Sequence, residues 1–210
     1  MKGLLLKEWL VIWKQGKLMI LLALIYGVMA VMGSGYFFAG FSVVFLSMLP
    51  ITVMGFDERS KWDHYAVTMP YSRKDIVLSK YIFSIICSLA ATIIFIIATI
   101  INWFIGKEPV DFSSLITQSI LMLSLGLFFS TVNLPIMFRF GVDKGRMWFI
   151  LLTVLLVGGL GGLLSLFEAK EVDIGNLIQR LTPFVLPVIT AGLLAFSAYL
   201  SIKIYEKREL

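Results

Sequence analysis

Residues 57 to 81, with the sequence DERSKWDHYAVTMPYSRKDIVLSKY, hold the densest mixture of charged and aromatic side chains in the chain. Charges of both signs select a partner by complementarity, and aromatic side chains are often the anchors of protein interfaces. The chain has few residues suited to catalysis or metal binding, because it has one histidine, His64, and one cysteine, Cys87. Neither a disulfide within the chain nor a histidine-pair zinc motif is possible. The segment therefore predicts recognition of another molecule, and no metal site is expected.

The spacing within this segment predicts a folded structure. Four residues recur at intervals that place them on one face of a short helix: Trp62, Tyr65, Ala66 and Met69. Pro70 ends that helix, because the residue before a proline is pushed out of the α region. Ser72, followed by Asp75, resembles a capping box that opens a new helix. We expect a rigid projection; the alternative is a solvated loop whose amphipathic helix is seated in the membrane.

The composition identifies the environment of that segment. The chain is 59% hydrophobic and 15% charged, whereas a globular domain is about 45–50% apolar and about 25% charged. No Asp, Glu, Lys or Arg lies between Leu18 and Phe56, and roughly 20 apolar residues suffice to cross a bilayer as a helix. We predict an all-α integral membrane protein with a single transmembrane domain, residues 1–210. Six uncharged segments have the required length: 18–34, 36–56, 82–105, 115–138, 147–167 and 181–202.

Residues 1–17 are too short and too charged to span a membrane. Their apolar residues fall on one helical face, and two lysines, Lys7 and Lys14, fall on the other side. This pattern is typical of a helix that lies in the headgroup layer. The predicted apolar face consists of Leu5, Trp9, Ile12 and Trp13.

The basic residues predict the orientation, because cytoplasmic loops are enriched in Lys and Arg. With both termini in the cytoplasm, only Lys107, Lys170 and Arg180 of the 18 basic residues lie outside. Orientation thus explains the net charge of +5, and no nucleic-acid partner is expected. The basic residues on the inner side are Lys2, Lys7, Lys14, Lys17, Arg59, Lys61, Arg73, Lys74, Lys80, Arg139, Lys144, Arg146, Lys203, Lys207 and Arg208.

The six expected spans contain no ionisable acid or base, although a proton- or sodium-coupled carrier commonly needs one. Neutral polar residues take their place, and they either bond between helices or line a substrate path. Gly158 to Gly162 offers a close-packing seam for a second copy of the chain, and Pro183 and Pro187 suggest a broken or kinked start to the last span. The possible path residues in the third span are Ser84, Ser88, Thr92, Thr99 and Asn102.

The segment from residue 57 also resembles a known family. An acidic residue, then Trp, Tyr, Pro, Arg, Val and Lys-Tyr at set intervals is similar to the coupling-helix region of the small bacterial type-2 ABC transporter permeases. The resemblance extends to the six-span layout, the interfacial N-terminal helix and the basic C-terminus. The matching residues are Glu58, Trp62, Tyr65, Pro70, Ser72, Arg73, Val77, Lys80 and Tyr81, with Met69 where Leu is usual.

The resemblance implies a coupling loop, residues 57–80, whose helix docks into a separate ABC ATPase subunit. The chain has no Gly-x-x-x-x-Gly-Lys-Ser/Thr motif, so we expect ATP and Mg²⁺ to be bound by the ATPase and this chain not to be an enzyme. The implied assembly contains two permease chains, identical or homologous, within the lipid of a bacterial plasma membrane. The implied ATPase-coupling residues are Asp57, Glu58, Arg59, Trp62, Tyr65, Met69, Pro70 and Arg73.

Within that family the chain is most similar to small exporters of amphipathic peptides, such as phenol-soluble-modulin and antimicrobial-peptide exporters. Uncharged spans that carry scattered hydroxyl groups suit a substrate with a large apolar area. We therefore expect export of an amphipathic peptide. Two alternatives stay open from the residues alone: an autonomous channel or secondary carrier, and a non-transporting immunity protein that binds a toxic peptide.

Overall fold

The computed structural model describes residues 2–32, 35–105, 112–145, 147–148, 151 and 174–207. Every element with assigned bounds in these ranges is a helix. The helices are α1 (Lys2–Gln15), α2 (Lys17–Met32), α3 (Gly35–Ser47), α4 (Leu49–Arg59), α5 (Trp62–Thr68), α6 (Arg73–Phe104), α7 (Phe112–Phe140) and α9 (Ile174–Glu206).

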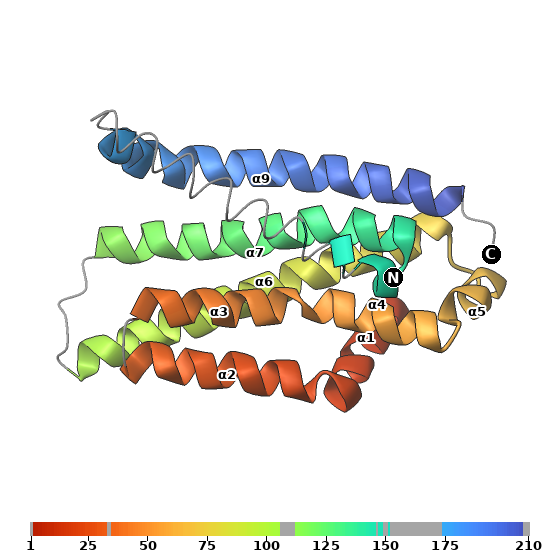
Figure 1. Ribbon diagram of the computed structural model, residues 1–210, viewed down its shortest axis with the longest axis horizontal. Coiled ribbons are helices and arrows are strands. Elements are labelled where there is room, and N and C mark those ends of the chain that lie inside the picture. The colour runs from red at the N-terminus through yellow and green to blue at the C-terminus, as the bar shows by residue number, and fades with distance from the viewer. Residues whose placement is uncertain are drawn as a thin grey trace.

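The long helices lie side by side, and the short ones gather at one end (Figure 1). α7 packs against α9 and α6, and α3 packs against α2, α6 and α7. Figure 1 shows α5 at the same end of the molecule as both chain termini. The expected all-helical bundle is therefore present, with α5 between α4 and α6 at one of its ends.

Four described helices are long and apolar enough to cross a membrane: residues 38–59, Arg73–Phe104, Phe112–Phe140 and residues 185–206. A fifth is obtained if the bent pair of α1 and α2 counts as one span. These findings show a multi-pass membrane protein but do not establish six spans. The expected span 147–167 and the glycine seam at 158–162 lie almost wholly outside the described residues.

The second span consists of two helices, α3 and α4, that meet at Met48. Pro50, at the start of α4, has no backbone N–H and cannot continue the helical hydrogen-bond ladder. The ladder resumes at once, since Thr52 N donates to Met48 O over 3.0 Å. The charged end of α4 is thus a direct extension of a membrane span.

A proline inside α7 opens a contact to another helix. Pro135 cannot donate to the carbonyl of Thr131, four residues earlier. The Ser197 hydroxyl of α9 donates to that carbonyl over 2.6 Å, and Ser197 also bonds with Tyr81 of α6 over 2.7 Å. The carbonyl that Pro135 leaves unpaired therefore takes part in hydrogen bonds that join α6, α7 and α9.

The last span differs from its expected form. α9 is assigned as one helix from Ile174 to Glu206 and runs through Pro183 and Pro187 without a break. A membrane helix tolerates prolines where neighbouring groups satisfy the carbonyls that they release. The start of α9 is therefore helical and not broken, while the predicted kink stays a prediction.

α1 turns away from α2 by 75°. Gly16 lies between them, and a Cβ atom there would be 3.0 Å from the carbonyl oxygen of Ile12, closer than side chains normally pack. Trp9 and Trp13 are exposed and stacked, with ring centroids 6.4 Å apart, whereas Ile12 is buried. The predicted grouping of Ile12 with the tryptophans on one face is therefore wrong, because Ile12 faces the protein.

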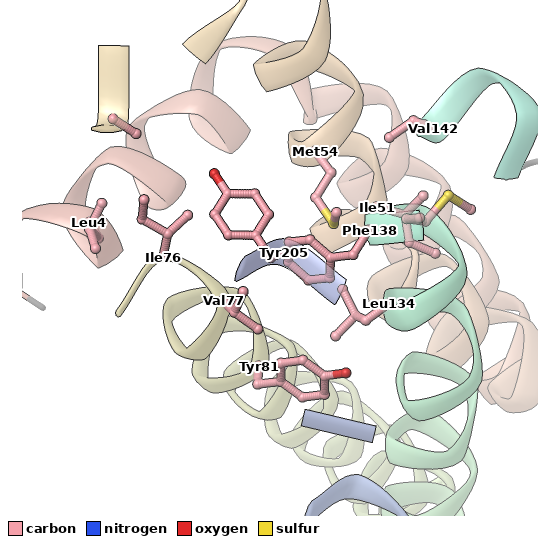
Figure 2. Close-up of a cluster of buried hydrophobic side chains, with 12 residues drawn as sticks. Leu4, Ile51, Met54, Ile76, Val77, Tyr81, Leu134, Phe138, Val142 and Tyr205 are labelled. Carbon is pink, nitrogen blue, oxygen red and sulfur yellow. The ribbon is translucent and has the colours of Figure 1, made fainter. Parts of the chain in front are cut away.

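The largest buried cluster lies beneath the coupling loop and joins distant parts of the chain. Figure 2 shows Leu4 of α1 and Ile76 of α6 in this cluster, together with Tyr205 near the end of α9. Phe138 of α7 meets the Tyr205 ring edge-on, with centroids 5.6 Å apart. The coupling loop thus rests on a core to which both terminal helices contribute.

Candidate coupling site

The short helix at the centre of the coupling loop is set off by an abrupt change of backbone direction at each end. Lys61 adopts the left-handed conformation, with φ of 52°, which separates α5 from α4. At the other end Met69 is extended, with ψ of 160°, as expected for a residue before proline. The predicted termination of the helix at Pro70 is confirmed.

The predicted capping box is also confirmed. The Ser72 hydroxyl accepts a hydrogen bond from Asp75 N over 3.1 Å. The Asp75 carboxylate accepts one from Ser72 N over the same distance. These reciprocal bonds satisfy backbone donors that the first turn of a helix leaves unpaired. Together they begin α6 within the coupling loop, well before its apolar section.

The apolar residues of α5 divide between two sides. Ala66 is buried and Trp62 packs against the core cluster, while Tyr65 is 63% exposed and Met69 is 40% exposed. The prediction of one shared apolar face was therefore wrong. The inward side fastens α5 to the bundle, while Tyr65 of α5 and Met69, the residue that follows the helix, remain exposed.

Four charged side chains, which we call the charge quartet, lie behind α5: Lys7, Glu8, Asp57 and Lys80. Lys7 Nζ contacts the Asp57 carboxylate oxygens at 2.5 and 2.6 Å and Glu8 Oε1 at 3.3 Å. Lys80 Nζ contacts Glu8 Oε1 at 2.7 Å and also bonds Asp57 Oδ2. Asp57, a predicted coupling residue, is therefore buried in an ionic cluster and is not exposed to a partner.

Three more coupling residues are placed at the edges of the loop. Glu58 Oε2 accepts a hydrogen bond from Val142 N over 2.6 Å, just beyond the end of α7. Arg73 Nη1 donates to the carbonyl oxygen of Glu206 over 2.7 Å, at the end of α9. Arg59 is exposed. Glu58 and Arg73 thus fasten the loop to α7 and α9.

A groove opens between α1 and the end of α4, beside α5. Its volume is about 530 Å³. Lys7 lies over the Trp62 ring on one wall, 4.8 Å from the ring centroid, an arrangement in which the ring face attracts the cation. The other lining residues are Val11, Gln15, Phe56, Asp57, Arg59 and Ser60.

The five possible path residues of α6 are divided differently. Ser84, Ser88 and Thr92 are buried, and the hydroxyls of Ser88, Thr92 and Thr99 donate to carbonyls of their own helix four residues back. Asn102 instead donates to the Ala30 carbonyl of α2 over 3.3 Å. Helix packing accounts for these contacts, and a role in a substrate path stays a prediction.

Three residues of the charge quartet, Lys7, Glu8 and Lys80, were not predicted as site residues. The two lysines were predicted to lie on the inner side of the membrane, and Lys80 also matched the family motif, but no contact to an acid was expected. The available signal was their chemistry: a lone acid within α1, and a lysine that is followed by an apolar stretch. Their contact depends on the bend at Gly16, which brings α1 back across α6.

The family model for ABC-2 family transporter protein matches residues 3–206, nearly the whole chain. The chain belongs to this family. No curated protein and no solved structure shows a significant match to the chain.

Membership makes this chain a transmembrane subunit of an ABC transporter, and it implies an ABC ATPase as partner. Members of this kind are membrane subunits that typically do not catalyse the hydrolysis themselves. The apolar helices agree with that assignment. The family does not specify the substrate or the direction of transport.

Proposed function

We propose that this ABC-2 subunit exports amphipathic peptides and that α5 receives the force of ATP binding and hydrolysis. The observation that carries the proposal is that the two sides of α5 have different surroundings. Its inner side is fixed to the core, while Tyr65 and Met69 stand exposed. A force applied to the outer side would pass to the spans without first deforming the loop.

The outward side of α5 has the chemistry of a docking surface. Tyrosine is among the residues that dominate binding energies when a partner buries them. Exposed charges around it, Arg59 and Lys61 among them, can orient the partner and raise its rate of association. The groove beside α5 offers room for an additional segment of the same partner.

The proposed orientation places α5 and both termini in the cytoplasm of a bacterial cell. The distribution of basic residues supports it, and so does the position of α5 at the end of the molecule that holds both termini (Figure 1). ATP and Mg²⁺ would bind to the partner, because the sequence has no P-loop motif.

A second permease chain is proposed because ATPases of this class act in pairs and one bundle offers little room for a central path. The peptide substrate is supported by the described spans, which combine large apolar surfaces with small hydroxyl side chains. Spans of this composition suit a ligand with a large apolar area and neutral hydrogen-bonding groups. Ions are not expected as substrates.

Co-purification tests the docking surface. The tagged chain should recover a protein with a P-loop, identified by mass spectrometry, in a complex whose mass indicates two copies of each chain. Replacing Tyr65 and Met69 by Ser should weaken that complex about 30-fold or more, if the pair contributes the roughly 2 kcal/mol of a hot spot. The same result would place α5 in the cytoplasm, where the ATPase is.

The matched control is Tyr199→Ser on α9, because Tyr199 is 59% exposed, close to the value for Tyr65. It should leave ATPase recovery unchanged. Equal recovery of the ATPase by the parent chain and by the Tyr65 and Met69 variant would show that α5 is not its docking surface.

A further inference from the structure

The charge quartet joins three helices that are far apart in the sequence. Lys7 and Glu8 come from α1, Asp57 from α4 and Lys80 from α6. Every acid in it contacts both lysines, and every lysine contacts both acids. Glu8 is 1% exposed, so this cluster is a buried part of the fold and not a chance pairing at the surface.

α1 also touches the coupling loop at both ends of α5. At the start of α5, Lys7 lies over the Trp62 ring. After α5, the Tyr71 hydroxyl lies so close to Gly3 that a Cβ atom there would be 2.9 Å from it. Leu4 and Ile76 share the buried cluster between these two points (Figure 2). α1 therefore contacts the coupling loop both at the start of α5 and after its end.

Stability alone does not account for the quartet. Burying charges carries a desolvation cost that apolar side chains of similar volume would avoid. Among the described residues, Glu8 Oε2 also has no hydrogen-bond partner. Ionic contacts differ from apolar packing in being directional, so they define the rotation and register of one helix against another. The quartet supplies that definition for α1 against α4 and α6.

We propose that the quartet makes α1 part of the element that transmits force, with Glu8 and Lys80 as its positioning residues. This inference rests on the proposed function, in which α5 receives the force. When the ATPase displaces α5, the quartet carries α1 along with the ends of α4 and α6. α1 then moves as one body with the coupling loop and does not serve only as an anchor in the headgroup layer.

A covalent tether tests whether α1 moves with the loop. In a Cys87→Ala background, Gly3→Cys and Tyr71→Cys place two thiols at a gap that the Tyr71 side chain fills in the parent protein. A bifunctional thiol reagent about the length of a tyrosine side chain should join them. The tethered transporter, reconstituted with its ATPase, should keep its ATP-driven peptide transport. Loss of transport on tethering, with the ATPase still bound, would overturn the proposal.

A second set of variants tests the positioning residues. Glu8→Leu with Lys80→Met removes one acid and one base, so the remaining pair of Lys7 and Asp57 stays neutral. This double variant should bind the ATPase and hydrolyse ATP but lose most peptide transport per ATP, and the tether should restore it. Lys14→Met, at an exposed position of α1, is the control and should change nothing.

The outcomes separate the two proposals. Full transport per ATP by the untethered double variant would show that the quartet is structural only. Failure of the tether to restore transport in a double variant that binds the ATPase would likewise overturn the inference. If the double variant does not fold, the tethered parent protein still tests the inference: retained transport supports it, and loss of transport overturns it. Absence of any ATPase from the parent complex would instead contradict the proposed function.

Discussion

Lys80 illustrates how the meaning of a single residue depends on an element far away in the sequence. It lies about two turns into α6 and contacts two carboxylates, one from α1 and one from α4. From the sequence, its positive charge predicts only which side of the membrane it faces. Its burial follows from the 75° turn of α1, and the sequence pattern does not predict where that turn directs the helix.

The quartet predicts that removing one charge is costly. Lys80→Met leaves two buried carboxylates with one lysine, and breaking a buried pair in this way typically costs about 3–5 kcal/mol. We expect a lower unfolding temperature for the purified subunit in detergent. Adding Glu8→Leu should recover most of the loss, because the set becomes neutral again.

The control for this prediction is Lys74→Met, which removes an exposed lysine from the first turn of the same helix. Exposed charges contribute little to stability, so its unfolding temperature should stay close to that of the parent. Similar unfolding temperatures for the Lys74 and Lys80 variants would mean that the quartet does not stabilise the fold.

Residue roles within α5 were only partly predictable. The spacing of Trp62, Tyr65, Ala66 and Met69 predicts a helix correctly, but α5 covers only Trp62–Thr68, and its apolar residues do not all face the core. The position of the core beneath α5 decides that Trp62 and Ala66 face inward. Trp62→Ala is consequently expected to loosen the loop from α1 and from the core, and not to remove a free docking side chain.

At the scale of elements, α6 is the structural link between the proposed docking surface and the membrane. It extends over 32 residues without a break, a length of about 48 Å at 1.5 Å per residue. Its first two turns, residues 73–80, belong to the coupling loop and its remainder to a span. Motion of α5 would therefore reach the interior through one continuous helix whose starting point is determined by the Ser72 cap.

The cap gives a prediction at this scale. Ser72→Ala removes the acceptor for Asp75 N and should cost about 1 kcal/mol. Amide hydrogen exchange in the first turn of α6 should accelerate, while the middle of the helix stays protected. Ser72→Thr keeps a hydroxyl at the cap and is the control. An unchanged exchange rate at Asp75 in Ser72→Ala would show that the box does not hold the start of α6.

Most helices could be predicted from uncharged runs, because crossing a bilayer requires a minimum apolar length. The start of α6 was predictable for another reason, since capping chemistry is local in sequence. The ends of α1 and the course of α9 through Pro183 and Pro187 were less predictable. Both depend on which neighbouring groups satisfy the backbone, and those neighbours come from distant segments.

At the scale of the whole molecule, the described helices form a membrane bundle, and several polar contacts between distant segments lie at one end of it. The charge quartet, the Glu58 contact to Val142 and the Arg73 contact to Glu206 all lie around α5. These contacts agree with the proposal that force applied at α5 is passed into the bundle.

Transport in reconstituted vesicles tests the central claim most directly. The complex is inserted with α5 and the ATPase facing outward, and uptake of a fluorescent amphipathic helical peptide is measured. We predict accumulation that requires hydrolysable ATP and that the Tyr65 and Met69 double variant loses. Peptide uptake of equal rate without ATP, or peptide binding with no uptake at all, would contradict the claim that this chain is the membrane subunit of an ATP-driven peptide exporter.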